Sequence, residues 1–500
     1  MQSTLPPPPE PPTGSGLATL DDHWMEPDPP ERRPLDGRAI AAVLVCGVVF
    51  DQAVRRSTTS VAVSVLLMVT AVAVLASGRL ETPQSRRAMA TVPLFAVWLA
   101  IRTSPWLIPL DLIAVGLLVV VALATSGGTP MRAIGPVQAI REVGLSIGAV
   151  IGSLGFVQRA LTSAQLAAAT AQGRPVLVGL ALMIPVVAVL GSLLASGDAL
   201  TDEALASAGV STWLGHIGLI LLGAWLALAL VYRAASRDPE PLGVDGPRVG
   251  AVEATVVLSG IAALYSAFTA LQVAGALGAA SDLLDDPVAT ANWARSGFFQ
   301  LLWAAGLTLG VVLLLDRVVD RTDRRAVRRY RRLVIVTCGL TCVVVGVSVV
   351  RIARYSDTFG LTMLRLYAGL FALWIAVVFA LVARRAMHHE PPTWLAVRAG
   401  IAGLGLLFAL NVANPEALVV RFDTTTPDRY DVDYLTTALS TDAIPTLIDR
   451  WDQLTPRERG DLTRTLCGME IPDRDGWLSW NRSRANARSA LLELCGRPDN

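Results

Sequence analysis

The segment "LVIVTCGLTCVVVGVSVVRIARYSDTFGLTMLRLYAGLFALWIAVVFALV", residues 333–382, places a short charged stretch between two long apolar runs. The lengths of the two runs, 333–350 and 361–382, are close to the roughly 20 residues that a helix needs to cross the apolar core of a bilayer. The stretch between them, "RYSDTFG" (354–360), combines charge with a glycine. The pattern predicts two membrane-spanning helices joined by a polar hairpin that turns at Asp357–Gly360.

Apolar runs of this kind recur along the chain. Of its 500 residues, 53% are hydrophobic and 17% are charged, whereas soluble domains carry about 25% charged residues. A bilayer offers no partners for backbone N–H and C=O groups, so such runs are expected to be helices. We therefore predict an all-α, polytopic transmembrane helical bundle of about eleven spans. The windows are 39–54, 58–76, 89–104, 107–125, 176–196, 213–232, 250–279, 298–315, 333–350, 361–382 and 394–412, and 142–173 is left unassigned.

Composition divides the sequence into three parts. Residues 1–37 are rich in proline and lack the basic-then-apolar order of a secretory signal, which predicts a disordered cytoplasmic tail. Residues 38–412 hold the spans. Residues 413–500 are charged and helical in period, which predicts a small α-helical C-terminal domain. Cys467 and Cys495 lie in this domain; they form a disulfide if the domain is extracytoplasmic, and the alternative is two buried free thiols.

Arginine is distributed unevenly between the loops, and this sets the predicted orientation. Three loops hold thirteen arginines in total, and the three loops that alternate with them hold three. Basic residues favour the cytoplasmic side, so we expect a multi-pass protein of a bacterial inner membrane with a cytoplasmic N-terminus and an extracytoplasmic C-terminus. The arginine-rich loops are 233–249, 316–332 and 383–393, and the arginine-poor loops are 197–212, 280–297 and 351–360.

Charge composition narrows the function classes. The net charge is +1 and lysine is absent, which excludes phosphate-binding and Schiff-base mechanisms that need lysine. The abundance of Ala, Val, Gly and Arg indicates a GC-rich bacterium such as an actinobacterium. The eight arginines of 317–332 predict a cytoplasmic anchor, with contact to an anionic lipid or a cytoplasmic partner as the alternative. No nucleic-acid-binding fold accompanies this charge, so nucleic acid is not an expected partner.

Ionisable residues within or at the ends of spans are candidate functional residues. Arg365 lies near the predicted outer end of its span, and we expect it to pair with Asp111, Asp198 or Asp357. No arrangement of His, Cys, Asp and Glu has the spacing of a metal site. The sequence therefore predicts no catalytic residue, no cofactor and no metal.

Four segments resemble the conserved signatures of a known family. They are "WARSGFFQL" (293–301), "ARYSDTFGLTMLRLY" (353–367), "NPEALVVRFD" (414–423) and "DVDYLTTALSTDAIP" (431–445). In this order they are similar to an uncharacterised family of polytopic, largely actinobacterial integral membrane proteins catalogued only as a domain of unknown function. The resemblance extends over residues 176–490. It implies membership and a membrane location, and it supplies no reaction.

All four segments fall in or beside loops on the predicted outer side. We therefore expect them to pack together as one outer cap, in which arginines 295, 354 and 365 meet aspartates 357, 433 or 442. The candidate functional or structural residues of this cap are Arg295, Arg354, Tyr355, Asp357, Gly360, Thr362, Arg365, Tyr367, Asn414, Asp433, Tyr434 and Asp442.

Three functional hypotheses follow from this organisation. The leading one is a non-enzymatic integral membrane protein, associated with the cell envelope or acting as a membrane-embedded partner. A transporter or channel for a small solute is the second, although no repeated half is visible in the sequence. A membrane enzyme at the outer face is the third, with Asp433 and Asp442 as candidate carboxylates but no nucleophile beside them. The sequence leaves the oligomeric state open.

Overall fold

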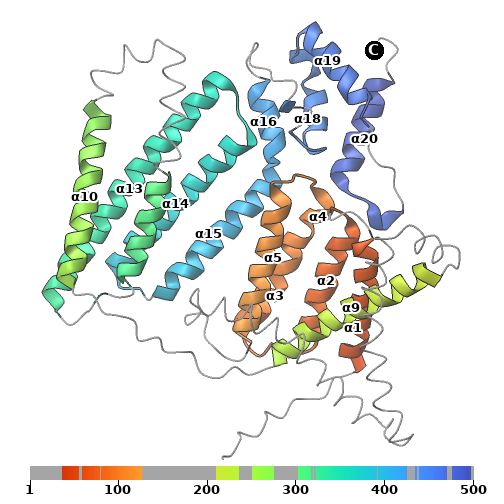
Figure 1. The fold of residues 1–500 in the computed structure, drawn as a ribbon, viewed down its shortest axis with the longest axis horizontal. Coiled ribbons are helices and arrows are strands. Elements are labelled where there is room, and N and C mark those ends of the chain that lie inside the picture. The colour runs from red at the N-terminus through yellow and green to blue at the C-terminus, as the bar shows by residue number, and fades with distance from the viewer. Residues whose placement is uncertain are drawn as a thin grey trace, which may run out of the picture. The chain divides into compact units, whose positions relative to one another are not determined.

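The computed structural model describes about two thirds of the chain, and its elements there are helices (Figure 1). Residues 35–500 form one compact unit. The predicted tail up to residue 36, the unassigned segment 142–173 and the window 176–196 lie outside the described residues. The described residues are 37–55, 59–78, 80–126, 210–235, 251–274, 302–316, 319, 323–390, 392–424, 434–435, 438–469 and 476–496.

Five helices in this part of the chain are long and apolar enough to cross a membrane. They match the expectation of an all-α membrane protein, and the predicted count of eleven spans is not confirmed. The five are α5 (Leu107–Ala124), α9 (Val210–Ala235), α13 (Arg324–Phe359), α14 (Met363–His388) and α15 (Pro392–Ala413). The shorter apolar segments are in α1 (Gly37–Val54), α2 (Val61–Ala76), α10 (Ala251–Ala274) and a helix at 302–316.

The window 89–104 is not one span, which corrects the prediction. The helix α3 (Pro83–Ala96) begins earlier, where Thr82 caps it by accepting a hydrogen bond from Ser85 N. Pro93, which has no N–H to donate, lies within α3. A second short helix, α4 (Trp98–Ile101), follows, and the chain then leaves helical geometry before α5.

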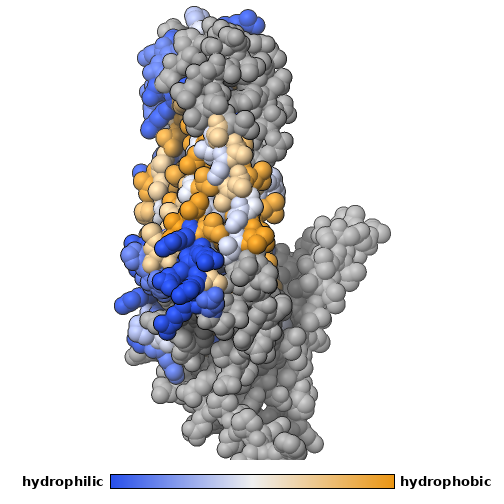
Figure 2. All heavy atoms as spheres, turned by 90° about the vertical axis from the view of Figure 1, so that its left-hand side faces the viewer, coloured by the Kyte–Doolittle hydropathy of each residue, from blue (hydrophilic) through white to orange (hydrophobic). Residues whose placement is uncertain are grey.

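Helix α13 extends beyond its apolar window at both ends, which corrects two predicted loops. Its first turns begin at Arg324, within the segment expected to be a loop, and Asp323 caps them by accepting from Arg325 N. Its last turn continues through Asp357 to Phe359, so the turn to α14 lies at 360–362 and not at Asp357–Gly360. Arginine is a good helix former. Figure 2 shows the surface on the side of α10 and α13. A band of hydrophobic residues there has hydrophilic residues at both ends, as expected for an apolar helix with polar extensions.

Two hydrophobic cores hold the apolar helices together, and a third lies in the C-terminal segment. The first core is built from α1, α2, α3, α5 and α9. The second is built from α10, the helix at 302–316, α13 and α14. Helix α15 joins them, because its Leu395 lies in the second core and its Leu407 and Leu410 lie in the first.

Glycines allow α1 and α9 to approach closely. A Cβ added at Gly47 would lie 2.3 Å from the carbonyl oxygen of Ile220, and one added at Gly223 would lie 2.3 Å from Cβ of Phe50. Neither neighbouring atom can rotate away, since one is backbone and the other is fixed to it. Small residues serve the same purpose at other membrane helix interfaces.

A valine at Gly223 is expected to separate α1 from α9. Overpacking of this kind costs about 1–3 kcal/mol, and the free energy of unfolding of Gly223→Val, measured by denaturant titration in detergent micelles, should fall by that amount. Gly116→Val is the matched control, because a Cβ at Gly116 in α5 meets no atom within 4 Å. Equal effects of the two substitutions would contradict the close approach.

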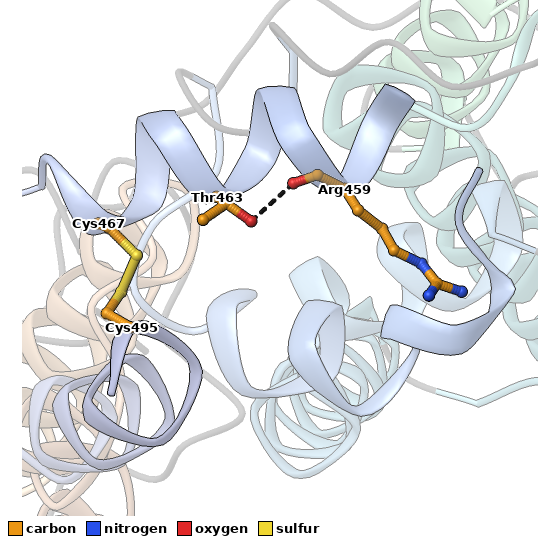
Figure 3. The surroundings of a disulfide bond; sticks show 4 residues. All are labelled: Arg459, Thr463, Cys467 and Cys495. Atoms are coloured by element: carbon orange, nitrogen blue, oxygen red, sulfur yellow. Dashed lines mark hydrogen bonds between the residues drawn. A yellow bond between two sulfur atoms is a disulfide. The ribbon is translucent and has the colours of Figure 1, made fainter. Parts of the chain in front are cut away.

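The C-terminal segment folds as a small helical lobe with its own core. We define the C-terminal lobe as residues 414–496. Its helices α19 and α20 are joined at their C-terminal ends by a disulfide between Cys467 and Cys495 (Figure 3), one of the two alternatives that the sequence left open. A reciprocal capping box between Thr455 and Glu458 starts α19. The elements are α16 (Pro415–Asp423), α18 (Ile444–Asp449), η4 (Trp451–Gln453), α19 (Pro456–Cys467), η5 (Trp477–Ser479) and α20 (Arg482–Cys495).

Candidate functional site

The C-terminal lobe meets the bundle at the loop between α4 and α5. The buried carboxylate of Asp442 accepts two backbone hydrogen bonds at Oδ2, from Thr103 N at 2.8 Å and from Ser104 N at 2.9 Å. Its Oδ1 lies 3.7 Å from Nη1 of Arg102. These N–H groups belong to neither helix, and a buried N–H without a partner is costly. Asp442 therefore provides the acceptor for both N–H groups of the loop and links the loop to the lobe.

A second buried carboxylate, Glu416, lies beside the first. Its Oε2 accepts from both N and Oγ of Ser440, each at 2.7 Å. Ser440 Oγ also lies 3.4 Å from Oδ2 of Asp442, so it bridges the two carboxylates. Burial raises the pKa of the Glu416 carboxyl, and the negative charge of Asp442 acts in the same direction.

Asn414 fixes the start of α16 against the segment that carries Asp442. Its Nδ2 donates to the carbonyl oxygen of Asp442 at 2.9 Å, and its Oδ1 caps α16 by accepting from Ala417 N. Its φ of 55° is left-handed, a conformation that asparagine adopts more readily than most residues. The residue thus sets both the turn after α15 and the position of the lobe.

The network continues into two candidate spans. Asn411 in α15 donates from Nδ2 to Oδ1 of Asp111 in α5 at 2.8 Å, and both side chains are buried. The carbonyl oxygen of Asn411 accepts from Nε of Arg102 at 2.9 Å. Burial lowers the pKa of Arg102, and the nearby Asp442 opposes that shift. Arg102 thereby connects the polar pair in the spans with the carboxylates of the lobe.

Helix α20 closes the other side of the same loop. Asn481, which caps α20, donates from Nδ2 to the carbonyl oxygens of Leu99 at 3.2 Å and Arg102 at 3.1 Å. The hydroxyl of Thr103 lies 2.8 Å from that of Thr441 and 3.2 Å from that of Ser483. Both α16 and α20 therefore hold the lobe on the bundle.

We call this network the polar junction. Several of its buried oxygen atoms have no hydrogen-bond partner among the described residues, and leaving such an atom unpaired costs about 1–3 kcal/mol. The junction brings three carboxyl groups together with one guanidinium group. No group of three or more His, Cys, Asp or Glu in the described ranges could hold a metal ion. The oxygen atoms without a hydrogen bond are Asp111 Oδ2, Asn411 Oδ1 and Asp442 Oδ1, the last of which faces Arg102; the junction's other members are Arg102, Thr103, Ser104, Asn414, Glu416, Ser440, Thr441, Asn481 and Ser483.

Arg365 contacts other groups than the sequence predicted. Its guanidinium stacks over the ring of Tyr355, with 4.3 Å between the central carbon and the ring centroid. Its Nη1 donates to the carbonyl oxygens of Phe359, at 3.2 Å, and of Gly360. No ion pair joins Arg365 to Asp111 or Asp357 in the described residues, and the third expected partner, Asp198, lies outside them; Arg365 instead bonds to backbone carbonyl oxygens at the end of α13.

The turn between α13 and α14 also docks on the lobe. Asp423 Oδ1 accepts from Leu361 N at 2.6 Å, and Tyr434 OH accepts from Met363 N at 2.7 Å. At Gly360, where φ is 76°, an added Cβ would lie 3.1 Å from Asp423 Oδ1. Thr362 caps α14 by accepting from Arg365 N. The positive φ and the close carboxylate together explain a glycine here.

Three of the four quoted segments thus come together, at 353–367, 414–423 and 434–445. Within them, Asp442 and Asn414 belong to the polar junction, and Tyr367 lies beside it, stacked on Trp106 with 5.4 Å between ring centroids. Other predicted cap residues do not belong to the junction: Arg354 and Asp357 are exposed in the last turns of α13. Arg295 and Asp433 lie outside the described residues. Asp442 pairs with Arg102, which the predicted set did not include.

Sequence reasoning missed most members of the junction, among them Arg102, Asn411, Glu416 and Asn481. A signal existed for Glu416, which belongs to the quoted "NPEALVVRFD". Arg102 was hidden because it lay inside the window 89–104 and was counted as part of a span. Asn411 and Asn481 carry no local pattern, since their partners are distant in sequence.

A family match covers both sides of this junction. Residues 88–450 match the family model described as "Domain of unknown function (DUF4153)". The chain belongs to this family. The predicted resemblance to an uncharacterised family is confirmed, although the match extends over 88–450 and not over 176–490. Among curated proteins and among solved structures, nothing matches the chain. The DUF4153 match takes in Arg102 and Asp442, whereas α19, α20 and the disulfide follow its end at residue 450.

Proposed function

We propose that this DUF4153 protein is a non-enzymatic integral membrane protein of the bacterial inner membrane, and that it holds its C-terminal lobe as a fixed docking platform for a partner in the cell envelope. The docking of Asp442 on Thr103 and Ser104 carries this proposal. A flexible linker would be enough if the protein only had to keep the lobe close to the membrane. A lobe held by buried hydrogen bonds instead presents one surface in one orientation.

Two observations support an extracytoplasmic lobe. The disulfide between Cys467 and Cys495 is of a kind that persists in oxidising compartments. Six of the eight arginines of α13 lie in its first turns, at 324–332, whereas the lobe docks on the turn after its last residue. The 36 residues of α13 place these ends about 54 Å apart. Basic residues favour the cytoplasmic side, where the arginine-rich segment 317–332 would contact anionic lipid or a cytoplasmic partner.

The lobe also offers a surface for a partner. Trp477 in η5 and Leu492 in α20 are each 70% exposed. Large apolar side chains exposed on a fixed domain are typical anchors in protein interfaces. We therefore place the docking surface on α20 and η5.

Site-specific photocrosslinking in intact cells tests this function. A photoreactive phenylalanine analogue at position 477 or 492 should give the same crosslinked partner, whereas one at the exposed Arg457 of α19 should give little. Asp442→Asn should reduce the yield at both positions several-fold while the protein stays in the membrane. The platform is refuted if neither position crosslinks, or if the yield does not depend on Asp442.

A small-solute transporter is the second candidate. The observation that favours it is the buried Asp111–Asn411 pair, because polar groups inside spans are costly and commonly mark substrate or proton pathways. In proteoliposomes with a trapped pH-sensitive dye, a transporter coupled to protons would show a flux that Asp111→Asn abolishes. Equal flux through both proteins, or none, would reject this candidate.

A further inference from the structure

A cavity of about 320 Å³ lies between the C-terminal lobe and the bundle. The apolar part of its lining comes from the lobe and includes Leu439, Leu447 and Met469. Leu447 lies in the core of the lobe, and Leu439 and Met469 pack against that core. The volume is at the lower end of the range of about 300–1,000 Å³ found for small-molecule sites.

The remaining part of the cavity lining is polar and includes a guanidinium group. Thr103 and Thr441 contribute hydroxyls, and Arg484 of α20 lies with Thr59, the residue two positions before α2. Arg484 donates from Nη1 to Oγ1 of Thr59 at 2.7 Å, and from Nη2 to the carbonyl oxygens of Thr59 at 2.8 Å and of Ser479 at 2.9 Å. These acceptors are all neutral.

The charge of Arg484 is therefore uncompensated within the described part of the chain. Burial lowers its pKa, and the neighbouring positive charge of Arg488 acts in the same direction. A guanidinium has five N–H groups, so donors remain on Arg484 after these three bonds. Anionic groups bind arginine strongly because charge-assisted hydrogen bonds are stronger than neutral ones.

We propose that this cavity binds an amphipathic anion, with an apolar chain among the leucines of the lobe and a carboxylate or phosphate head group on Arg484. The apolar side chains and the single cation line the same cavity, whose volume is large enough for part of one chain. The cavity also lies where the lobe meets the end of the bundle, beside Thr59 and Thr103. A lipid of the bilayer and a free fatty acid share this chemistry. The proposal adds a ligand class and does not depend on a protein partner.

Photolabelling of the full-length protein tests the site. In an uncharged detergent, a diazirine analogue of palmitic acid should label the peptide 435–469. In nanodiscs, a diazirine phosphatidylglycerol should label the same peptide if the ligand is a lipid of the bilayer. If the ligand is a free fatty acid, the palmitic acid analogue should label this peptide and the phosphatidylglycerol should not. The corresponding diazirine alcohol, which has no charge, should label it about tenfold less, the factor expected for about 1.4 kcal/mol.

Three variants make the result specific. Arg484→Gln should lower labelling by the acid to the level of the alcohol, and Arg488→Gln, on the same helix but not lining the cavity, should leave it unchanged. Leu439→Trp should block labelling by filling the space while keeping Arg484 and its bonds to Thr59, so it remains informative if Arg484→Gln does not fold. Labelling that maps outside 435–469, or that persists in Leu439→Trp, would overturn the proposal.

Discussion

Asp442→Asn is expected to release the C-terminal lobe from the bundle. The substitution keeps the size of the side chain but removes the charge that faces Arg102. If the amide oxygen keeps the hydrogen bonds from Thr103 N and Ser104 N, the amide nitrogen, a donor, takes the place of Oδ1 and faces the guanidinium, which is also a donor. Removing one partner of a buried charged pair costs about 3–5 kcal/mol. The segment that carries Asp442 also loses its hold on the loop before α5.

Two measurements follow this change. The free energy of unfolding of the lobe, measured by denaturant titration in detergent, should fall by about 3–5 kcal/mol, and the loop between α4 and α5 should become open to protease in the native protein. Asp461→Asn is the matched control: the Asp461–Arg464 pair is exposed, and such a pair contributes about 0–1 kcal/mol. If the two variants behave alike, the junction does not hold the lobe.

Loss of the disulfide is expected to have the second-largest effect. Cys467 and Cys495 are separated by 28 positions, and removing a native disulfide from a small domain typically costs about 2–5 kcal/mol. Cys467→Ser should therefore lower the unfolding midpoint of the lobe. The helices of the bundle should keep theirs, because their cores are separate from that of the lobe.

Reduction provides the control for this prediction. Dithiothreitol should lower the lobe midpoint of the unsubstituted protein to that of Cys467→Ser and should have no further effect on the variant. The free thiols Cys46, Cys338 and Cys342 lie in the bundle, so a shift that dithiothreitol also produces in Cys467→Ser would point to them instead of the disulfide.

The sequence predicted the helices because their cause is local. An apolar run such as 361–382 can satisfy its backbone in lipid only as a helix, and α14 covers most of it as Met363–His388. The ends were less predictable: at Arg324 and Asp357, helical hydrogen bonding continues into polar sequence. Hydropathy marks where a helix is apolar, and caps such as Asp323 and Gly360 decide where it ends.

The candidate site could be predicted only in part. The segments 353–367 and 414–423 were recognised as belonging together, and the turn at Gly360 does dock on Asp423. Arg365 was expected to meet an aspartate, whereas in the described residues it reaches carbonyl oxygens of its own turn. An arginine near several acceptors binds those that the backbone brings closest, and sequence spacing does not show which these are.

The sequence by itself therefore determined an all-α membrane protein, its apolar helices and its family, since hydrophobicity and family signatures are properties of short segments. Only the tertiary structure decided which polar groups meet. Thr103 N and Asp442 are 339 positions apart, and Arg102 and Asn411 are 309 apart. Burial makes these contacts obligatory, because a polar group removed from water must find a partner, and packing of the helices determines which partner is within reach.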